Sequence, residues 1–201
     1  MMTSQAITDA LKGSYPDGTI EPVAAADGMP TIYVAREHIV DVCRELRDRP
    51  ELRYAFAVDM TAADYMPREP RFEVVVHLAS LGVAGFGETP KRLRIKIRVP
   101  GHEPVVPTLS NVWPAMGWAE REVWDLFGIL FDGNPDSRRI LMPEDWEGHP
   151  ARKDYPVQIK MTPKVYEPLQ LSPQEFASNV RGGDGTPGAR APRGTDKVRQ
   201  G

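Results

Sequence analysis

Two stretches of the 201-residue chain alternate apolar and polar side chains with a period of two, and this pattern restricts the fold most. Residues 91–100 (KRLRIKIRVP) place Leu93, Ile95, Ile97 and Val99 between basic side chains, and residues 71–81 (RFEVVVHLASL) alternate from Phe72 onward. Successive side chains of a strand point to opposite faces. The pattern therefore predicts two neighbouring strands with one buried face, and residues 54–65 predict a third, less regular strand.

Other segments of the first half alternate between helical and turn signals. Residues 3–12 and 36–47 space their apolar side chains as amphipathic helices do, and Thr3 or Ser4 is suited to cap the first helix. Residues 19–24 and 30–34 predict short strands around the turn Asp27-Gly28. The fold class expected is therefore α+β, a small mixed or antiparallel sheet with packed helices.

The only cysteine, Cys43, lies on the apolar stripe of the second helix, which predicts core packing rather than a reactive thiol. A single thiol excludes an internal disulfide, a cysteine-based zinc site and an iron–sulfur cluster. The N-terminal residues lack the apolar core of a signal peptide, and no apolar run approaches the ~18 residues of a membrane span. We expect a soluble protein that reaches a membrane only through partners.

The polar face of residues 91–100 is basic, with Arg92, Arg94, Lys96 and Arg98. Three interpretations stay open: a solvated face balanced by acidic groups such as Glu73, a docking site for an acidic protein, and a nucleic-acid site. A net charge of −3 and the lack of interleaved aromatic residues argue against nucleic acid.

Residues 120–156 are dense in ionisable groups, with nine acidic and five basic side chains and a local net charge of −4. A hydrolase that uses Glu144, Glu147 and His149 is one interpretation. It lacks a GxSxG nucleophile motif and a glycine-rich phosphate loop, and it has too few histidines for a metal site. The helix expected before Gly128 contains Arg121 and Asp125 at a spacing that predicts an i,i+4 ion pair. It is either a core helix or one that also contributes to an interface with another subunit.

The chain is expected to divide into an α+β domain (1–128), an extended docking arm (129–180) and a disordered, Gly/Pro/Arg-rich tail (181–201). Prolines in the arm oppose regular structure, and a long irregular segment does not belong inside a compact domain. Large apolar residues of the arm are expected to anchor it on a partner; they are Ile129, Leu130, Phe131, Ile140, Leu141, Met142, Trp146 and Tyr155.

Residues 120–156 (EREVWDLFGILFDGNPDSRRILMPEDWEGHPARKDYP), hereafter the signature segment, closely resemble the signature of the C-subunit family of respiratory complex I, the proton-pumping NADH:quinone oxidoreductase. Asn134 departs from the family, which usually has a basic residue, most often histidine, at this position. The matching residues expected at an interface between subunits are Glu120, Arg121, Glu122, Asp125, Leu126, Phe127, Arg138, Arg139, Pro143, Trp146 and Tyr155.

The resemblance implies a non-catalytic, structural subunit of the peripheral arm of the complex, on the cytoplasmic side of a bacterial membrane. It implies no catalytic residue, metal or cofactor in this chain, with flavin mononucleotide and iron–sulfur clusters in partner subunits. The chief partners implied are the large quinone-site D subunit, over which the C-terminal segment extends, and the B subunit. An equivalent role in an F420H2 dehydrogenase or a membrane-bound hydrogenase is the alternative within the family.

Overall fold

The computed structural model describes residues 3–82, 90–157 and 174. Apart from residue 174, the predicted remainder of the docking arm (158–180) and the predicted tail (181–201) lie outside the described residues, as do residues 83–89 between the strands predicted at 71–81 and 91–100. Among the helices of the described residues, none is long and apolar enough to cross a membrane.

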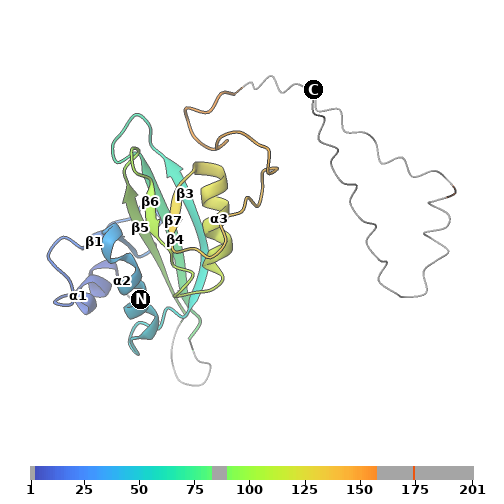
Figure 1. Ribbon diagram of the computed structural model, residues 1–201. Helices are drawn as coiled ribbons and strands as arrows, with labels where there is room; N and C mark the ends of the chain where they lie inside the picture. The colour runs from blue at the N-terminus through green and yellow to red at the C-terminus, as the bar shows by residue number, and fades with distance from the viewer. Residues whose placement is uncertain (1–2, 83–89, 158–173, 175–201) are drawn as a thin grey trace. The chain divides into compact units, whose positions relative to one another are not determined.

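A five-stranded mixed sheet forms the centre of the molecule and confirms the predicted fold class (Figure 1). Its order is β1-β2-β5-β4-β3, with antiparallel neighbours except for the parallel pair β2–β5. The strands are β1 (Ile20–Val23), β2 (Thr31–Val34), β3 (Phe56–Asp64), β4 (Phe72–Ser80) and β5 (Lys91–Val99). The turn between β1 and β2 is closed by the Asp27 carboxylate, which accepts the N–H of Met29 at 3.1 Å.

The alternation in β4 and β5 is confirmed by their register. Val76 lies opposite Ile95, and Val74 lies opposite Ile97, so the apolar sets of both strands share one face. These four side chains are fully buried, whereas the basic side chains of β5 remain at least partly exposed.

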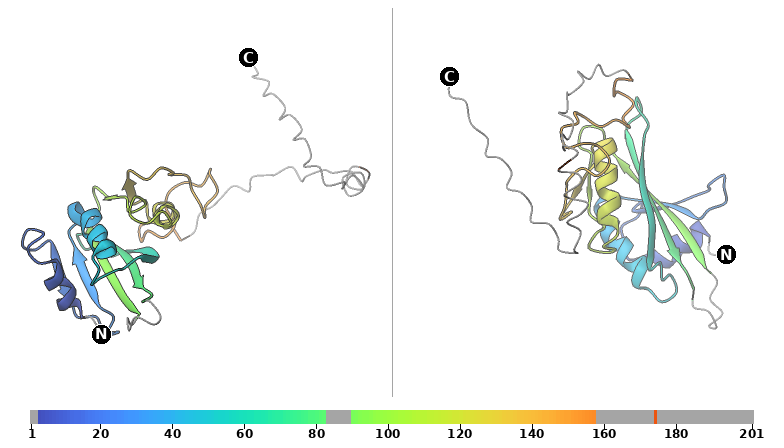
Figure 2. Two further views of the ribbon diagram at one scale, coloured as in Figure 1. Left: turned by 90° about the horizontal axis from the view of Figure 1, so that it is seen from below. Right: turned by 90° about the vertical axis from the view of Figure 1, so that its right-hand side faces the viewer.

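The helices are α1 (Ser4–Leu11), the 3-10 turn η1 (Arg36–His38), α2 (Ile39–Asp48) and α3 (Met116–Phe127). The Thr3 hydroxyl accepts the N–H of Ala6 at 3.2 Å, so Thr3 is the predicted cap of α1. Helices α2 and α3 lie on the same side of the sheet and bury its apolar face (Figure 2).

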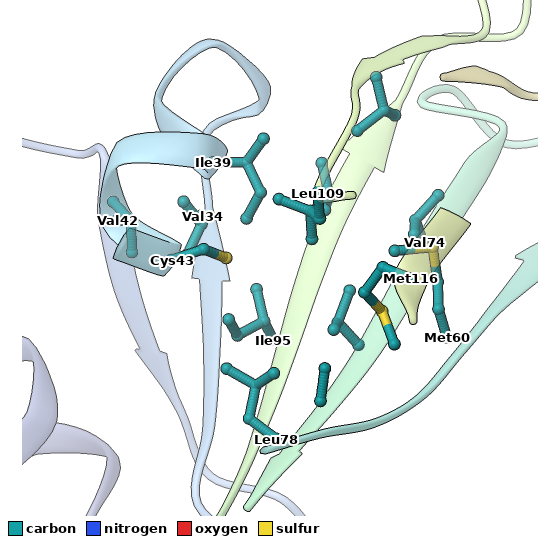
Figure 3. Close-up of a cluster of buried hydrophobic side chains, with 14 of the residues drawn as sticks. Val34, Ile39, Val42, Cys43, Met60, Val74, Leu78, Ile95, Leu109 and Met116 are labelled. Carbon is teal, nitrogen blue, oxygen red and sulfur yellow. The ribbon is translucent and has the colours of Figure 1, made fainter. Parts of the chain in front are cut away.

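Cys43 packs inside this core, as predicted, among Val34, Ile39 and Ile95, with Met116 of α3 beside Val74 (Figure 3). Burial raises the pKa of the Cys43 thiol well above its ordinary value, which keeps the thiol protonated.

A second, two-stranded sheet pairs β6 (Val105–Pro107) in parallel with β7 (Leu130–Asp132). Ile129 is fully buried and Phe131 nearly so, because this pairing draws the chain back onto the domain. The compact unit accordingly runs from Met1 to Val157, whereas the sequence places its end at residue 128. The described part of the predicted docking arm thus packs on its own domain.

Candidate functional site

Glu120 lies on the buried stripe of α3, between Met116 and Val123, and is fully buried. Its carboxylate accepts the N–H of Leu109 at 2.6 Å and the Thr108 hydroxyl at 2.6 Å. Burial raises the pKa of Glu120, and these hydrogen bonds only partly oppose it. Glu120 therefore attaches the turn that follows β6 onto α3. Its carboxyl group is removed from water in the process, which costs free energy.

Asn134 supplies the third donor to Glu120, with its side-chain N–H 2.7 Å from Oε2. Its own Oδ1 accepts the N–H of Asp136 at 2.8 Å, which fixes the orientation of the amide. At the position where the resemblance predicts a basic residue, this chain thus provides a neutral donor to a buried carboxylate.

Asp125, also fully buried, binds the irregular segment that follows β7. Its Oδ2 accepts the backbone N–H groups of Ile140, Leu141 and Met142 at 3.0, 2.8 and 2.8 Å, and Oδ1 accepts Arg139 at 2.6 Å. Burial acts to raise the pKa of Asp125, but these bonds outweigh it and the pKa lies below its ordinary value. One carboxylate therefore satisfies three consecutive N–H groups that no strand or helix would satisfy.

The predicted ion pair between Arg121 and Asp125 is wrong, because each side chain has other partners. Arg121 donates to the carbonyl oxygens of Arg138 at 2.8 Å and Arg139 at 3.0 Å, and it forms a salt bridge with Asp136 at 3.2 Å. An exposed i,i+4 pair contributes only ~0.3–0.5 kcal/mol, whereas an unsatisfied buried carbonyl or N–H costs more.

The last turn of α3 is capped by residues 149–152 rather than by solvent. His149 Nδ1 lies 3.0 Å from the Asp125 carbonyl oxygen, and the Ala151 N–H donates to Leu126 at 3.0 Å. Arg152 donates to the Phe127 carbonyl at 2.5 Å and adds a positive charge at the negative end of the helix dipole.

Gly128 is required at this junction for two reasons. It ends α3 in the left-handed conformation, with φ +71°, as predicted for the helix stop. A Cβ atom at Gly128 would also lie 2.5 Å from His149 Cδ2 and 2.7 Å from Arg152 Nη2.

A third buried carboxylate, Asp64 at the end of β3, holds the far end of the signature segment. It accepts a hydrogen bond from the N–H of Lys153 at 2.8 Å. It also accepts two hydrogen bonds from the Arg71 guanidinium, at 2.7 and 3.0 Å. Arg71 also reaches Asp154 at 2.7 Å. The Arg71 guanidinium is the main reason why the pKa of Asp64 lies well below its ordinary value.

The other predicted interface residues have mixed placements. Glu122, Arg138 and Pro143 are exposed, whereas Leu126, Phe127, Arg139, Trp146 and Tyr155 are partly buried. The Tyr155 hydroxyl donates to the Glu147 carbonyl at 3.0 Å. The prediction missed Asp64, Arg71, Thr108 and Arg152, which lie up to 89 positions from their partners and share no local pattern with them.

The residues of the hydrolase interpretation do not form a catalytic group in the described part of the chain. Glu144 and Glu147 are exposed, and no hydrogen bond joins either to His149. His149 Nδ1 is hydrogen-bonded to the Asp125 carbonyl oxygen, and the His149 ring packs edge-on against Trp124, with ring centres 5.8 Å apart. Within residues 3–82 and 90–157, no three His, Cys, Asp or Glu side chains are grouped to hold a metal ion.

The basic face of β5 is largely neutralised by acidic neighbours. Salt bridges join Arg94 to Asp27 at 2.5 Å, Lys96 to Glu73 at 2.7 Å and Arg98 to Glu21 at 3.1 Å. Of the four predicted cations, Arg92 alone forms no salt bridge with a described residue. The interpretation of a face balanced by Glu73 and other acids is therefore confirmed for three of the four cations.

Known proteins share both the sequence and the fold. Residues 32–160 match the family described as respiratory-chain NADH dehydrogenase, 30 Kd subunit. The NADH-quinone oxidoreductase C subunit of Roseiflexus sp. (strain RS-1) is 46% identical over 75% of this chain and 83% of its own length. The corresponding C 2 subunit of Rhizobium meliloti (strain 1021) is 44% identical over 74% of this chain and 78% of its own length.

Two solved structures share the fold. A trypsin-resistant fragment of Nqo5 is 30% identical, with a TM-score of 0.51, and the match covers 68% of this chain and 99% of the fragment. A chain of the membrane-bound sulfane sulfur reductase, an archaeal respiratory membrane complex, shares the fold at 24% identity, with a TM-score of 0.59 over 76% of this chain and 83% of that chain. The chain belongs to the 30 kDa subunit family of respiratory complex I, whose curated members include the NADH-quinone oxidoreductase C subunits.

Proposed function

We propose that this protein is a non-catalytic structural subunit of the peripheral arm of the proton-translocating NADH:quinone oxidoreductase. One observation carries the proposal: the buried ionisable groups of the signature segment are engaged in holding their own chain. Glu120, Asp125 and Arg121 bind backbone and side-chain groups of residues 108–142, which leaves them unavailable for proton transfer to a substrate.

The partners proposed are the large quinone-site D subunit and the B subunit, between which quinone is reduced. The family membership supports this choice. Such a protein aids electron transfer by keeping its neighbours in their working geometry, and the reaction takes place in those neighbours.

The proposal includes no redox cofactor in this chain, with flavin mononucleotide and iron–sulfur clusters in partner subunits. The single cysteine supports it, because its side chain is fully buried and its thiol is held protonated, whereas a cluster needs several thiolates. The location proposed is the cytoplasmic face of the bacterial membrane, reached through partner subunits. The alternative is the equivalent subunit of an F420H2 dehydrogenase or a membrane-bound hydrogenase.

Affinity purification of the tagged full chain from its own host tests the proposal. The D and B subunits are expected to co-purify with it, together with NADH:quinone oxidoreductase activity, while the chain expressed alone is expected to have no visible absorption. Hydrogenase or F420H2-oxidising subunits in place of NADH-oxidising ones would favour the alternative. A flavin or cluster bound to the isolated chain would contradict the proposal.

A chain that ends at Val157 separates the domain from the rest of the predicted docking arm. We expect it to fold, because the compact unit ends at this residue, and to lose much of its binding to the D subunit. A matched chain that ends at Phe131 is expected to unfold at lower urea, because it lacks the residues that cap α3.

A further inference from the structure

Three large apolar side chains of α3 and residues 133–142 are exposed: Trp118 at 63%, Ile140 at 38% and Leu141 at 52%. Trp118 belongs to α3, whereas the other two belong to the irregular segment after β7. Arg121 links Trp118 to the irregular segment. Its guanidinium lies 4.8 Å from the Trp118 ring centre and donates to the carbonyl oxygens of Arg138 and Arg139, just before Ile140. We call Trp118, Ile140 and Leu141 the outer ridge.

The outer ridge is held in place by buried groups. Asp125 accepts the backbone N–H groups of both Ile140 and Leu141, so these two N–H groups are satisfied from the inside. Their side chains remain at the surface without regular secondary structure around them. A preformed surface of this kind loses little conformational entropy when a partner binds.

Acidic side chains border the outer ridge. Glu122 lies on α3, one helical turn from Trp118, and Glu144 follows Leu141 by three residues. Both are exposed, and neither forms a salt bridge with a described residue. The exposed Arg138 attracts Glu144 electrostatically, but its salt bridge is with Asp136, at 2.8 Å. An apolar centre with a charged rim is the usual anatomy of a specific protein interface. Glu122, Asp136 and Glu144 outnumber Arg138, so the rim is negative in sum and favours a positive matching surface.

We infer that the outer ridge binds an apolar, lysine- or arginine-rich segment of a partner subunit, with Trp118 and Leu141 as anchors and Glu122 and Glu144 as the acidic rim. This inference rests on the proposed function and deepens it, because it names a docking surface on the folded domain and the chemistry of the occupant. An exposed tryptophan that is fixed by an arginine is well suited to be an interface hot spot.

The test compares variants of the tagged full chain, purified from cells that contain the whole complex. The ridge variant combines Trp118→Ala with Leu141→Ser, and the rim variant combines Glu122→Lys with Glu144→Lys. The control combines Phe56→Ala with Val58→Ser, two side chains of β3 that are each 53% exposed. Partner subunits that co-purify are quantified by mass spectrometry at low and high salt.

The ridge variant is expected to retain at least about tenfold less partner than wild type does, because it loses an interface hot spot. The rim variant is expected to lose partner mainly at low salt, because charge attraction is screened at high salt. The control is expected to stay near the wild-type level. Urea unfolding of the isolated variants checks that the fold is intact, and the rim variant keeps the test decisive if the ridge variant unfolds.

Several outcomes would overturn the inference. If wild type retains the D and B subunits and both variants retain them equally, the inference fails and the proposed function stands. If wild type retains no oxidoreductase partner, both fail. A ridge variant that turns a dimer of the isolated chain into a monomer would identify a second copy as the occupant. A chain ending at Val157 that crosslinks to partner through the ridge far better than the full chain would identify residues 158–201 as the occupant.

Discussion

Two regions of this molecule are rich in charge, and they use it in opposite ways. On the outer face of β5, cations meet acidic side chains of β4, of β1 and of the turn between β1 and β2. Both members of the Arg98–Glu21 pair are half exposed. In the signature segment, buried carboxylates meet backbone N–H groups. Asp125 alone binds three of them.

The difference follows from the backbone that each region has to stabilise. The backbone of β5 is satisfied by its neighbours β2 and β4, so its charged side chains add little beyond solubility. Residues 133–155 have no such ladder, and their N–H and carbonyl groups need side-chain partners once they pack on the domain. Charge density by itself therefore distinguishes neither an active site nor a binding face.

The largest effect is expected for Asp125→Ala. The substitution leaves Arg139 and three N–H groups without their acceptor, and breaking a buried pair of this kind costs about 3–5 kcal/mol of unfolding free energy. Urea unfolding measures the loss, and faster proteolysis within residues 133–147 localises it. The matched control is Asp132→Ala, an exposed carboxylate, which is expected to change little. Equal stability of the two variants would show that apolar contacts hold the segment instead.

A smaller loss, about 2–3 kcal/mol, is expected for Asp64→Ala at neutral pH. The pKa of Asp64 is lowered in the folded state, so its contribution is complete above the unfolded value of about 3.9 and is lost as pH falls through the folded value. The stability difference between wild type and variant should therefore shrink in strong acid. Asp154→Ala, which removes the more exposed partner of Arg71, serves as the control. A difference that persists at low pH would contradict the ionic explanation.

Asn134→Ala tests the neutral donor to the buried Glu120 carboxylate. Loss of the hydrogen bond to Glu120 is expected to cost about 1–2 kcal/mol at neutral pH. The pKa of Glu120 is already raised, and removal of a donor to the ionised form raises it further. The loss should therefore be larger at pH 7 than below the pKa of a free glutamate, about 4.3. Ser137→Ala, at an exposed neighbouring position, should be neutral; a pH-independent loss would argue against this role of Asn134.

The smallest effect is expected on the basic face. Arg98→Ala should change the unfolding free energy by about 0–1 kcal/mol, and a double-mutant cycle with Glu21→Ala should show a coupling that salt weakens. Arg92→Ala, which removes the cation without a salt bridge, is the reference. If the Arg98–Glu21 coupling energy were as large as the loss of unfolding free energy in Asp125→Ala, charge would stabilise both regions equally and the contrast between them would be wrong.

The sequence predicted regular elements because their signals are local. The period of two located β4 and β5 to within about two residues, and the helical stripe through Ile39, Val42 and Leu46 located α2. The sheet order and the parallel β2–β5 pair follow from contacts between distant segments, for which one sequence contains no local signal.

The attachment of residues 129–157 to the domain was not predicted, for a related reason. Prolines and the lack of a period correctly indicated irregular backbone, but the partners of that backbone lie elsewhere, as with Asp64 and Lys153. One signal was available. Glu120 occupies an apolar stripe between Met116 and Val123, and a carboxylate in such a place must be buried and bonded.

The cap on the last turn of α3 also has a consequence for synthesis of the chain. The residues that close it, His149 to Arg152, are translated 21 to 24 positions after Gly128. At translation rates of about 5–20 residues per second, this interval lasts about 1–5 s. Throughout it, the carbonyl oxygens of Leu126 and Phe127 are open to water, so α3 is completed only after the ribosome has passed Arg152.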